Sequence, residues 1–124
     1  MEKIKSGNFN DIVKNRKGNP WVIGHFIEED SLLKSSDIEI KWAFHHKGDS
    51  KSKIVSNIHA KTLCFLIRGR VSLIFPDCNQ NVSLKKEGDF IVWDGGVNHT
   101  WEVLEDSLII TVRWPSIPND QSIN

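Results

Sequence analysis

The chain has 124 residues, enough for one domain with a sizeable core, and its 39% hydrophobic and 26% charged residues are ordinary for a globular protein. Its 16 basic and 16 acidic residues cancel, so no net charge favours binding to nucleic acid or to an anionic membrane. The sequence has two cysteines, no apolar run of the roughly 18 residues that cross a bilayer, and no apolar signal-peptide core near its start. We therefore expect a cytoplasmic protein with no disulfide framework, no nucleic-acid partner and no membrane partner.

The two ends of the chain are polar. Residues 1–20 are rich in Lys, Asn and Gly and close with Asn19-Pro20, so we expect an N-terminal arm. Residues 11–14 could make one short helical turn there at most. Residues 117–124 are also polar, and we expect them to form a loose C-terminal tail.

Between these ends, short apolar segments alternate with turn residues. Residues 21–26 come first, and residues 38–44 alternate apolar with charged side chains, the period of a half-buried strand. The remaining apolar segments, separated mostly by Gly, Pro and Asp, are 62–68, 71–75, 82–84, 90–93, 99–104 and 108–114. Short strands at intervals of about ten residues predict one all-β domain over residues 21–116, a sandwich or a closed barrel.

The most specific pattern in the chain runs from Gly88 to His99. An apolar strand leads into a Gly-Gly turn, and His99 opens the next strand. This spacing resembles the second sequence motif of the cupins, which reads Gly, five residues, Pro, one residue, Gly, two residues, His. Gly88, Gly96 and His99 fall on the motif, and Asp94 stands at its Pro position.

The motif and the strand rhythm of residues 21–114 together resemble the small single-domain cupins. More narrowly, the chain resembles a group of short cupins that share a Trp-Val-x-Gly-His-Phe start, a Glu-x-Lys-Trp strand and a Gly-Asp-Phe turn. No established activity goes with that group. The resemblance implies a jelly-roll barrel, the double-stranded β-helix, with a small central cavity, and it leaves the function open.

The other cupin motif, His-x-His followed by a Glu and a Gly, is degraded in this chain. If its last Gly is Gly69, Thr62 stands at the Glu position. The two His positions are then held by Ser56 and Ile58, or by Val55 and Asn57 in the longer spacing. None of these side chains is a divalent-metal ligand of normal strength, whereas protein sites for Zn, Fe or Mn normally supply three or more N, O or S ligands.

In the cupins the His of the second motif is commonly a metal ligand, so His99 is the one candidate metal ligand that the resemblance implies. A Cys/His/His set of Cys64, His99 and one of His45 and His46 could still hold Fe, Mn, Ni or Zn. Adjacent residues of a strand point to opposite faces, so His45 and His46 cannot both contribute. We expect no well-formed metal centre.

Five residues are predicted to line a ligand site in the barrel: His99, Trp101, Cys64, His46 and Arg113. Trp101 shares strand parity with His99, and its ring suits a planar ligand or plain packing in the core. Cys64 shares parity with Thr62 and should face inward. Arg113 lies in an apolar strand and needs a carboxylate, which Glu105, Asp106 or an acidic ligand could provide.

The strand at residues 62–68 is apolar on both faces. Thr62, Cys64 and Leu66 are expected to face inward and the alternate residues outward. An outward apolar face must be covered, and because small cupins commonly dimerise through such faces, the resemblance implies a homodimer.

The leading hypothesis from the sequence is a small cupin that binds or senses a small molecule in its barrel cavity without a catalytic metal. The alternative is an enzyme: a metal-dependent oxygenase, or a metal-free isomerase or epimerase with His99 as its base. The third hypothesis is a purely structural module, whose barrel serves only as a scaffold for dimer formation.

Overall fold

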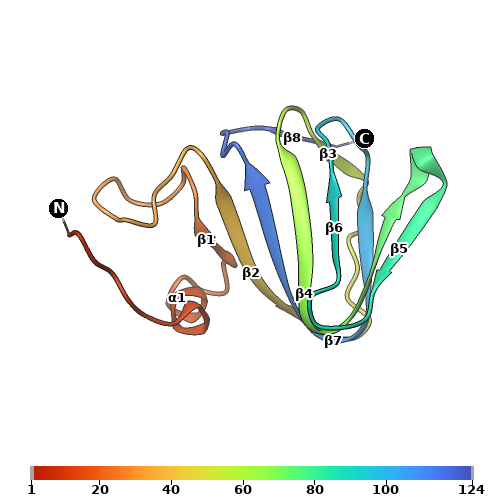
Figure 1. The fold of residues 1–124 in the computed structure, drawn as a ribbon, viewed down its shortest axis with the longest axis horizontal. Coiled ribbons are helices and arrows are strands. Elements are labelled where there is room, and N and C mark those ends of the chain that lie inside the picture. The colour runs from red at the N-terminus through yellow and green to blue at the C-terminus, as the bar shows by residue number, and fades with distance from the viewer. Residues whose placement is uncertain (1, 124) are drawn as a thin grey trace.

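A computed structural model describes residues 2–123 and shows an antiparallel β structure with a short helical arm (Figure 1). The elements in chain order are α1 (Phe9–Asn15), β1 (Trp21–Ile23), β2 (Glu39–His45), β3 (Val55–Asn57), β4 (Lys61–Phe75), η1 (Pro76–Cys78), β5 (Gln80–Leu84), β6 (Phe90–Trp93), β7 (Thr100–Trp114) and β8 (Gln121–Ile123). The all-β prediction is therefore confirmed.

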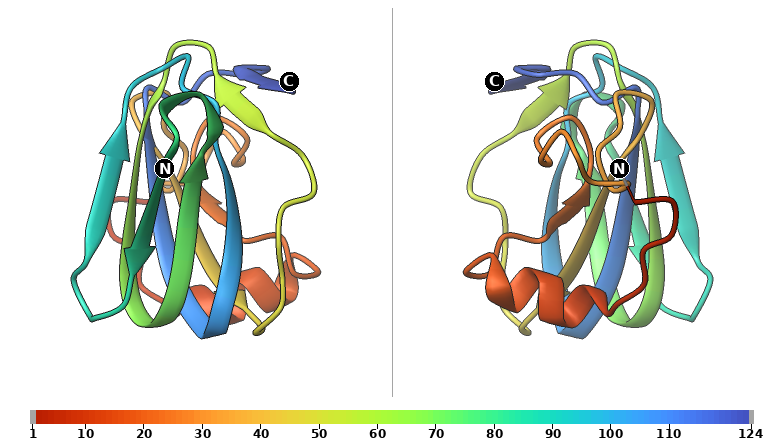
Figure 2. Two further views of the ribbon diagram at one scale, coloured as in Figure 1. Left: turned by 90° about the vertical axis from the view of Figure 1, so that its right-hand side faces the viewer. Right: turned by 90° about the vertical axis from the view of Figure 1, so that its left-hand side faces the viewer.

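Two long bent strands, β4 and β7, form the middle of the fold. They pair antiparallel along their length, and register shifts between Leu66 and Val71 bend the pair. As a result, β6 pairs with the first part of β4, whereas β5 pairs with the last part. β2 pairs with the last part of β7, and β1 flanks β2, so one folded sheet supplies both walls of a barrel (Figure 2).

The segment between β2 and β4 completes the second wall. Val55 and His99 exchange backbone hydrogen bonds of 3.1 and 2.8 Å, and Lys51 N–H donates to the carbonyl of Trp101 at 3.0 Å. Figure 2 shows this segment on the side opposite β6. It brings Lys51 against the first part of β7, which matters for the cavity described below.

The bend of β4 depends on Gly69, which has φ +102°. A Cβ on Gly69 would lie 2.2 Å from Ser107 Oγ and 2.4 Å from the carbonyl oxygen of Asp106. Ser107 cannot give way easily because it is fully buried, and its Oγ accepts from the N–H of Arg70 at 2.9 Å and donates to the carbonyl of Glu105 at 2.6 Å. Only glycine fits at this position.

The core follows the predicted parity of β4. Thr62, Cys64 and Leu66 are 1%, 5% and 0% exposed, so they face inward as predicted. The alternate residues are partly exposed on the outer face. There, Leu63 and Phe65 lie opposite Val92 and Phe90 of β6, whose exposures are 49% and 64%. Such an apolar face favours a covering partner, and the homodimer stays a prediction.

The N-terminal arm contains a longer helix than the predicted single turn. The side chain of Asn8 caps α1 by accepting from the N–H of Asn10 at 2.8 Å. The helix packs on β2, where Trp42 Nε1–H donates to Asn10 Oδ1 at 2.8 Å and the rings of Phe9 and Trp42 lie 5.7 Å apart. No helix within residues 2–123 has the length and apolar character needed to cross a membrane.

The C-terminal tail is docked, so the expectation that it is loose is wrong for its last described residues. β8 pairs with β3, and Asp120 is 6% exposed. The Asp120 carboxylate accepts from the N–H groups of His59 and Ala60 at 3.0 and 3.1 Å. A buried carboxylate with two backbone donors holds this segment against the barrel.

Candidate functional site

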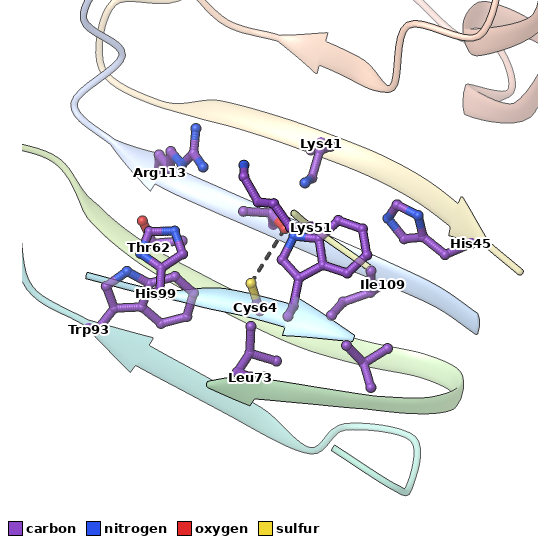
Figure 3. Close-up of a pocket in the computed structure, with 13 residues that line it drawn as sticks. Lys41, His45, Lys51, Thr62, Cys64, Leu73, Trp93, His99, Ile109 and Arg113 are labelled. Carbon is purple, nitrogen blue, oxygen red and sulfur yellow. Dashed lines mark hydrogen bonds between the residues drawn. The ribbon is translucent and has the colours of Figure 1, made fainter. Parts of the chain in front are cut away.

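A cavity of about 40 Å³, partly open to solvent, lies between the two walls of the barrel (Figure 3). Its lining includes three groups that carry positive charge, Lys41, Lys51 and Arg113, and two histidines, His45 and His99. No acidic residue lines it within residues 2–123. A chain with no net charge therefore has a positively charged cavity.

Four of the five predicted ligand-binding residues line this cavity: His99, Trp101, Cys64 and Arg113. That they bind a ligand stays a prediction. The ring of Trp101 packs against that of His45, with centroids 4.7 Å apart. The Cys64 thiol is buried 3.4 Å from Thr111 Oγ1, and burial raises its pKa, so it is a protonated thiol at neutral pH.

The fifth predicted ligand-binding residue, His46, lies outside the cavity, and the neighbouring His45 lines it instead. The His46 side chain is 75% exposed, with its ring against Phe44. The prediction was wrong because it favoured the apolar face of β2, to which Trp42 belongs. On that face Trp42 packs on α1 and His46 is exposed, whereas the face with Lys41 and His45 turns inward.

His99 is 3% exposed and neutral. Its Nδ1 lies 3.0 Å from the carbonyl oxygen of Val97, which can only accept, so Nδ1–H donates and Nε2 is left as an acceptor. The ring packs on Trp93 with centroids 4.7 Å apart. The pKa of His99 is lowered to about 4, mainly by burial and in part by the positive charges of Arg113 and Lys51, against the Val97 hydrogen bond, which raises it.

Lys41 is the most unusual charged group in the cavity. Burial lowers its pKa to about 8, and the charges of Arg113 and Lys51 act in the same direction. Burial also lowers the pKa of Lys51. No acidic side chain within residues 2–123 forms an ion pair with either lysine. Lys41 Nζ instead lies 5.6 Å from the centroid of the Trp21 ring.

Arg113 has an internal acidic partner, but not one of the two predicted. Its Nη1 lies 3.6 Å from Glu39 Oε2, and the guanidinium stacks on Trp21 with its Cζ 4.9 Å from the ring centroid. Glu105 and Asp106 are exposed near the middle of β7. Glu39 is the partner because it stands directly opposite Arg113 in the pairing of β2 with β7, a register that sequence parity alone does not reveal.

Three buried polar atoms around the cavity have no hydrogen-bond partner within residues 2–123: Thr62 Oγ1, Trp93 Nε1 and Arg113 Nε. These residues form one row across the sheet, since Thr62 pairs with Trp93 on β6 and with Arg113 on β7. A buried polar atom without a partner costs about 1–3 kcal/mol. Such atoms gathered in one row therefore point to a polar occupant.

The cavity does not fit the metal that the cupin resemblance implies for His99. Within the described residues, no three His, Cys, Asp or Glu side chains are placed to hold a metal ion. The positive charges of Lys41, Lys51 and Arg113 would also repel a divalent cation. The alternative set with Cys64 is weakened further because its thiol is protonated.

Sequence reasoning missed Lys41, Lys51 and Trp93 as lining residues. The sequence shows that Lys41 shares one strand face with His45 and Glu39. A face with charged residues on a half-buried strand is normally the solvent-exposed one, so Lys41 was not predicted to line the cavity. Lys51 lies in a segment without strand periodicity, so no pattern could have placed it. Trp93 ends β6 two residues before the Gly-Gly turn, and its inward direction followed from the parity of that strand.

No known family model matches the sequence, and no curated protein does either. Solved structures match the fold. A double-stranded β-helix protein from Klebsiella pneumoniae has a TM-score of 0.61 at 17% identity, over 72% of this chain and 71% of that one. KdgF from a Halomonas species has 0.57 at 18%, over 65% and 72%.

A cupin-2 domain protein from Shewanella frigidimarina matches over most of both chains, with 88% of this chain and 93% of that one, a TM-score of 0.53 and 18% identity. Identities this low establish the fold and carry no activity across. The folded sheet, the turn before His99 and these structural matches together show that this chain has the double-stranded β-helix fold, which is the fold of the small cupins.

Proposed function

We propose that the protein binds a small molecule in the barrel cavity and does so without a divalent-metal centre. The observation that carries this proposal is the row of unpaired buried polar atoms on Thr62, Trp93 and Arg113. A barrel that served only as a scaffold would gain stability by filling this space with apolar side chains.

The size of the cavity limits the occupant. A volume of about 40 Å³ holds roughly three water molecules, so the occupant is a compact molecule or the head group of a larger one. Lys51 lies on the segment between β2 and β3, outside the main sheet. A larger ligand would require this segment to release the hydrogen bond from Lys51 N–H to Trp101 of β7.

The binding experiment follows the indole N–H signals of Trp93 and Trp101 by NMR while compounds of different charge and shape are added. We expect a binding compound to shift both signals and to leave the signal of Trp114 in place, because Trp114 lies outside the cavity. If no compound in a broad set of small metabolite-like molecules moves the Trp93 signal, the proposal fails.

Metal analysis of the purified protein tests the second half of the proposal. We expect Fe, Mn, Ni and Zn far below one equivalent per chain. A near-stoichiometric metal that disappears in the His99→Ala variant would contradict the proposal directly. His46→Ala is the matched control, because His46 lies outside the cavity.

A second function, proton transfer in a metal-free isomerase or epimerase, is favoured by one observation. His99 is neutral with Nε2 as an acceptor, and Lys41, with a pKa of about 8, is an ammonium group that readily gives up its proton, so a proton acceptor and a proton donor face one cavity near neutral pH. The test is exchange of carbon-bound hydrogen in a bound ligand in heavy water. Exchange that is lost in His99→Gln supports the enzyme, and a bound ligand without exchange excludes it.

A further inference from the structure

We propose that the cavity is an oxyanion site, in which Lys41, Lys51 and Arg113 hold the carboxylate or phosphate group of the ligand. This inference rests on the proposed function and names the chemical class of its ligand.

The first argument is charge. Three groups that carry positive charge line the cavity, and Glu39 is the acidic side chain that pairs with one of them. Lys41 and Lys51 are left without an ionic partner within residues 2–123. Partly buried ammonium groups are costly unless an opposite charge accompanies them, and an anionic ligand supplies that charge.

The second argument is hydrogen bonding. The unpaired atoms Trp93 Nε1 and Arg113 Nε are donors that cannot accept, and the hydroxyl of Thr62 can donate as well. All three therefore suit an acceptor in the cavity. A carboxylate or phosphate offers several acceptor positions at once, and hydrogen bonds to a charged acceptor are about twice as strong as neutral ones.

The third argument is position. Thr62 and Arg113 stand opposite each other in one row of the sheet, and Cys64, Thr111 and Lys41 form the next inward-facing row. All of these residues line the cavity, and so does Lys51, whose segment is hydrogen-bonded to the first part of β7; Figure 3 labels Lys41, Lys51 and Arg113 among them. The positive groups thus approach one volume from both walls.

The aromatic residues suggest what accompanies the anionic group. Trp93 and Trp101 line the same cavity, each already packed on a histidine ring. Flat apolar surfaces beside a small charged pocket favour a compact anion or a planar acid with its carboxylate innermost. Benzoate and acetate are therefore suitable probes, with phosphate as the other oxyanion.

The experiment measures binding of acetate, benzoate and inorganic phosphate at pH 7 and constant ionic strength, by calorimetry and by the Trp93 indole signal. Acetamide and benzamide are the neutral partners of the two carboxylates. We expect saturable binding of at least one oxyanion and at least tenfold weaker binding of its neutral partner. Comparison of the two carboxylates with phosphate also distinguishes a carboxylate site from a phosphate site.

Lys41→Met and Lys51→Met should each weaken oxyanion binding at least tenfold. Lys53→Met is the matched control, because Lys53 is exposed two residues from Lys51 and does not line the cavity. Its affinity should equal that of the unmodified protein. Two lysine variants make the result independent of whether one of them folds poorly.

Equal binding of benzoate and benzamide, or equal loss of affinity in Lys53→Met, would overturn the oxyanion site. If the screen described above finds a neutral ligand while no oxyanion binds, this inference fails and the proposed function survives. If no compound of any charge binds, both fail.

Discussion

Glu39 and Arg113 stand directly opposite each other on β2 and β7, and Arg113 Nη1 lies 3.6 Å from Glu39 Oε2. Both side chains are about nine-tenths buried, with 10% and 11% exposed. Glu39 Oε1 also accepts from the hydroxyl of Ser116 at 2.8 Å. This carboxylate neutralises one positive group at the edge of the cavity and leaves Lys41 and Lys51 available to a ligand.

Replacing Glu39 with Gln should lower the free energy of unfolding by about 3 kcal/mol, because it leaves Arg113 buried without its counter-charge. The same change should strengthen oxyanion binding, since one negative charge beside the cavity is lost. Urea denaturation measures the first effect and titration with benzoate the second. Glu102→Gln, at an exposed position of β7, should change neither. A Glu39→Gln variant of unchanged stability would show that the ion pair is unimportant.

Lys41→Met should stabilise the unliganded protein at pH 7 by about 2 kcal/mol, because it removes a desolvated charge near two others. The pKa of Lys41 is lowered from 10.5 to about 8. Between these values the unfolded chain binds more protons than the folded one, so the stability of the unmodified protein rises with pH. The advantage of Lys41→Met should therefore shrink from pH 8 to pH 10.5. Thermal melts across this range, with Lys53→Met as the control, measure it.

The buried His99 should make the protein sensitive to acid. Its pKa is lowered from 6.5 to about 4, so between these values the unfolded chain takes up a proton that the folded protein excludes. Stability should fall by up to about 3 kcal/mol as the pH drops through this window. His45, whose pKa burial also lowers, contributes in the same direction. Urea midpoints at pH 7, 5.5 and 4 should decline less steeply in His99→Gln, whereas His46→Gln should keep the original slope.

Sequence periodicity predicted the fold well because alternation along a strand directly reports which face is buried. The inward set Thr62, Cys64 and Leu66 followed from parity alone. What periodicity could not supply is cross-strand register. The pairing of Glu39 with Arg113 joins segments far apart in the chain, whereas the internal partners predicted for Arg113, Glu105 and Asp106, precede it on the same strand.

The candidate site was harder to predict than the fold because its chemistry reverses the usual rule of burial. Charged residues of a half-buried strand normally face solvent, but in β2 the face with Lys41 turns inward. On the opposite face Trp42 is covered by α1, of which the sequence predicted only a single turn. His46 was chosen for this reason, and His45 is the residue in the cavity.

Gly69→Ala should destabilise the protein by about 3 kcal/mol or more, because the new Cβ would strike the buried Ser107 in addition to straining a backbone at φ +102°. Gly48→Ala is a matched control at φ +94° with open space around the added methyl group. It should show the cost of the backbone strain alone, about 1 kcal/mol. Equal losses in the two variants would mean that the contact with Ser107 relaxes freely.

The predicted homodimer can be tested through the outer face of β6. Phe90 is 64% exposed beside Val92, opposite the apolar outer residues of β4. We expect light scattering to give the mass of two chains at micromolar concentration, and Phe90→Glu to give one, because a charge cannot be buried in an apolar contact. Phe44→Glu is the control: Phe44 is also exposed, at 49%, but on β2, separated from β6 by β7 and β4. A monomeric unmodified protein, or dissociation by Phe44→Glu alone, would reject this face as the dimer interface.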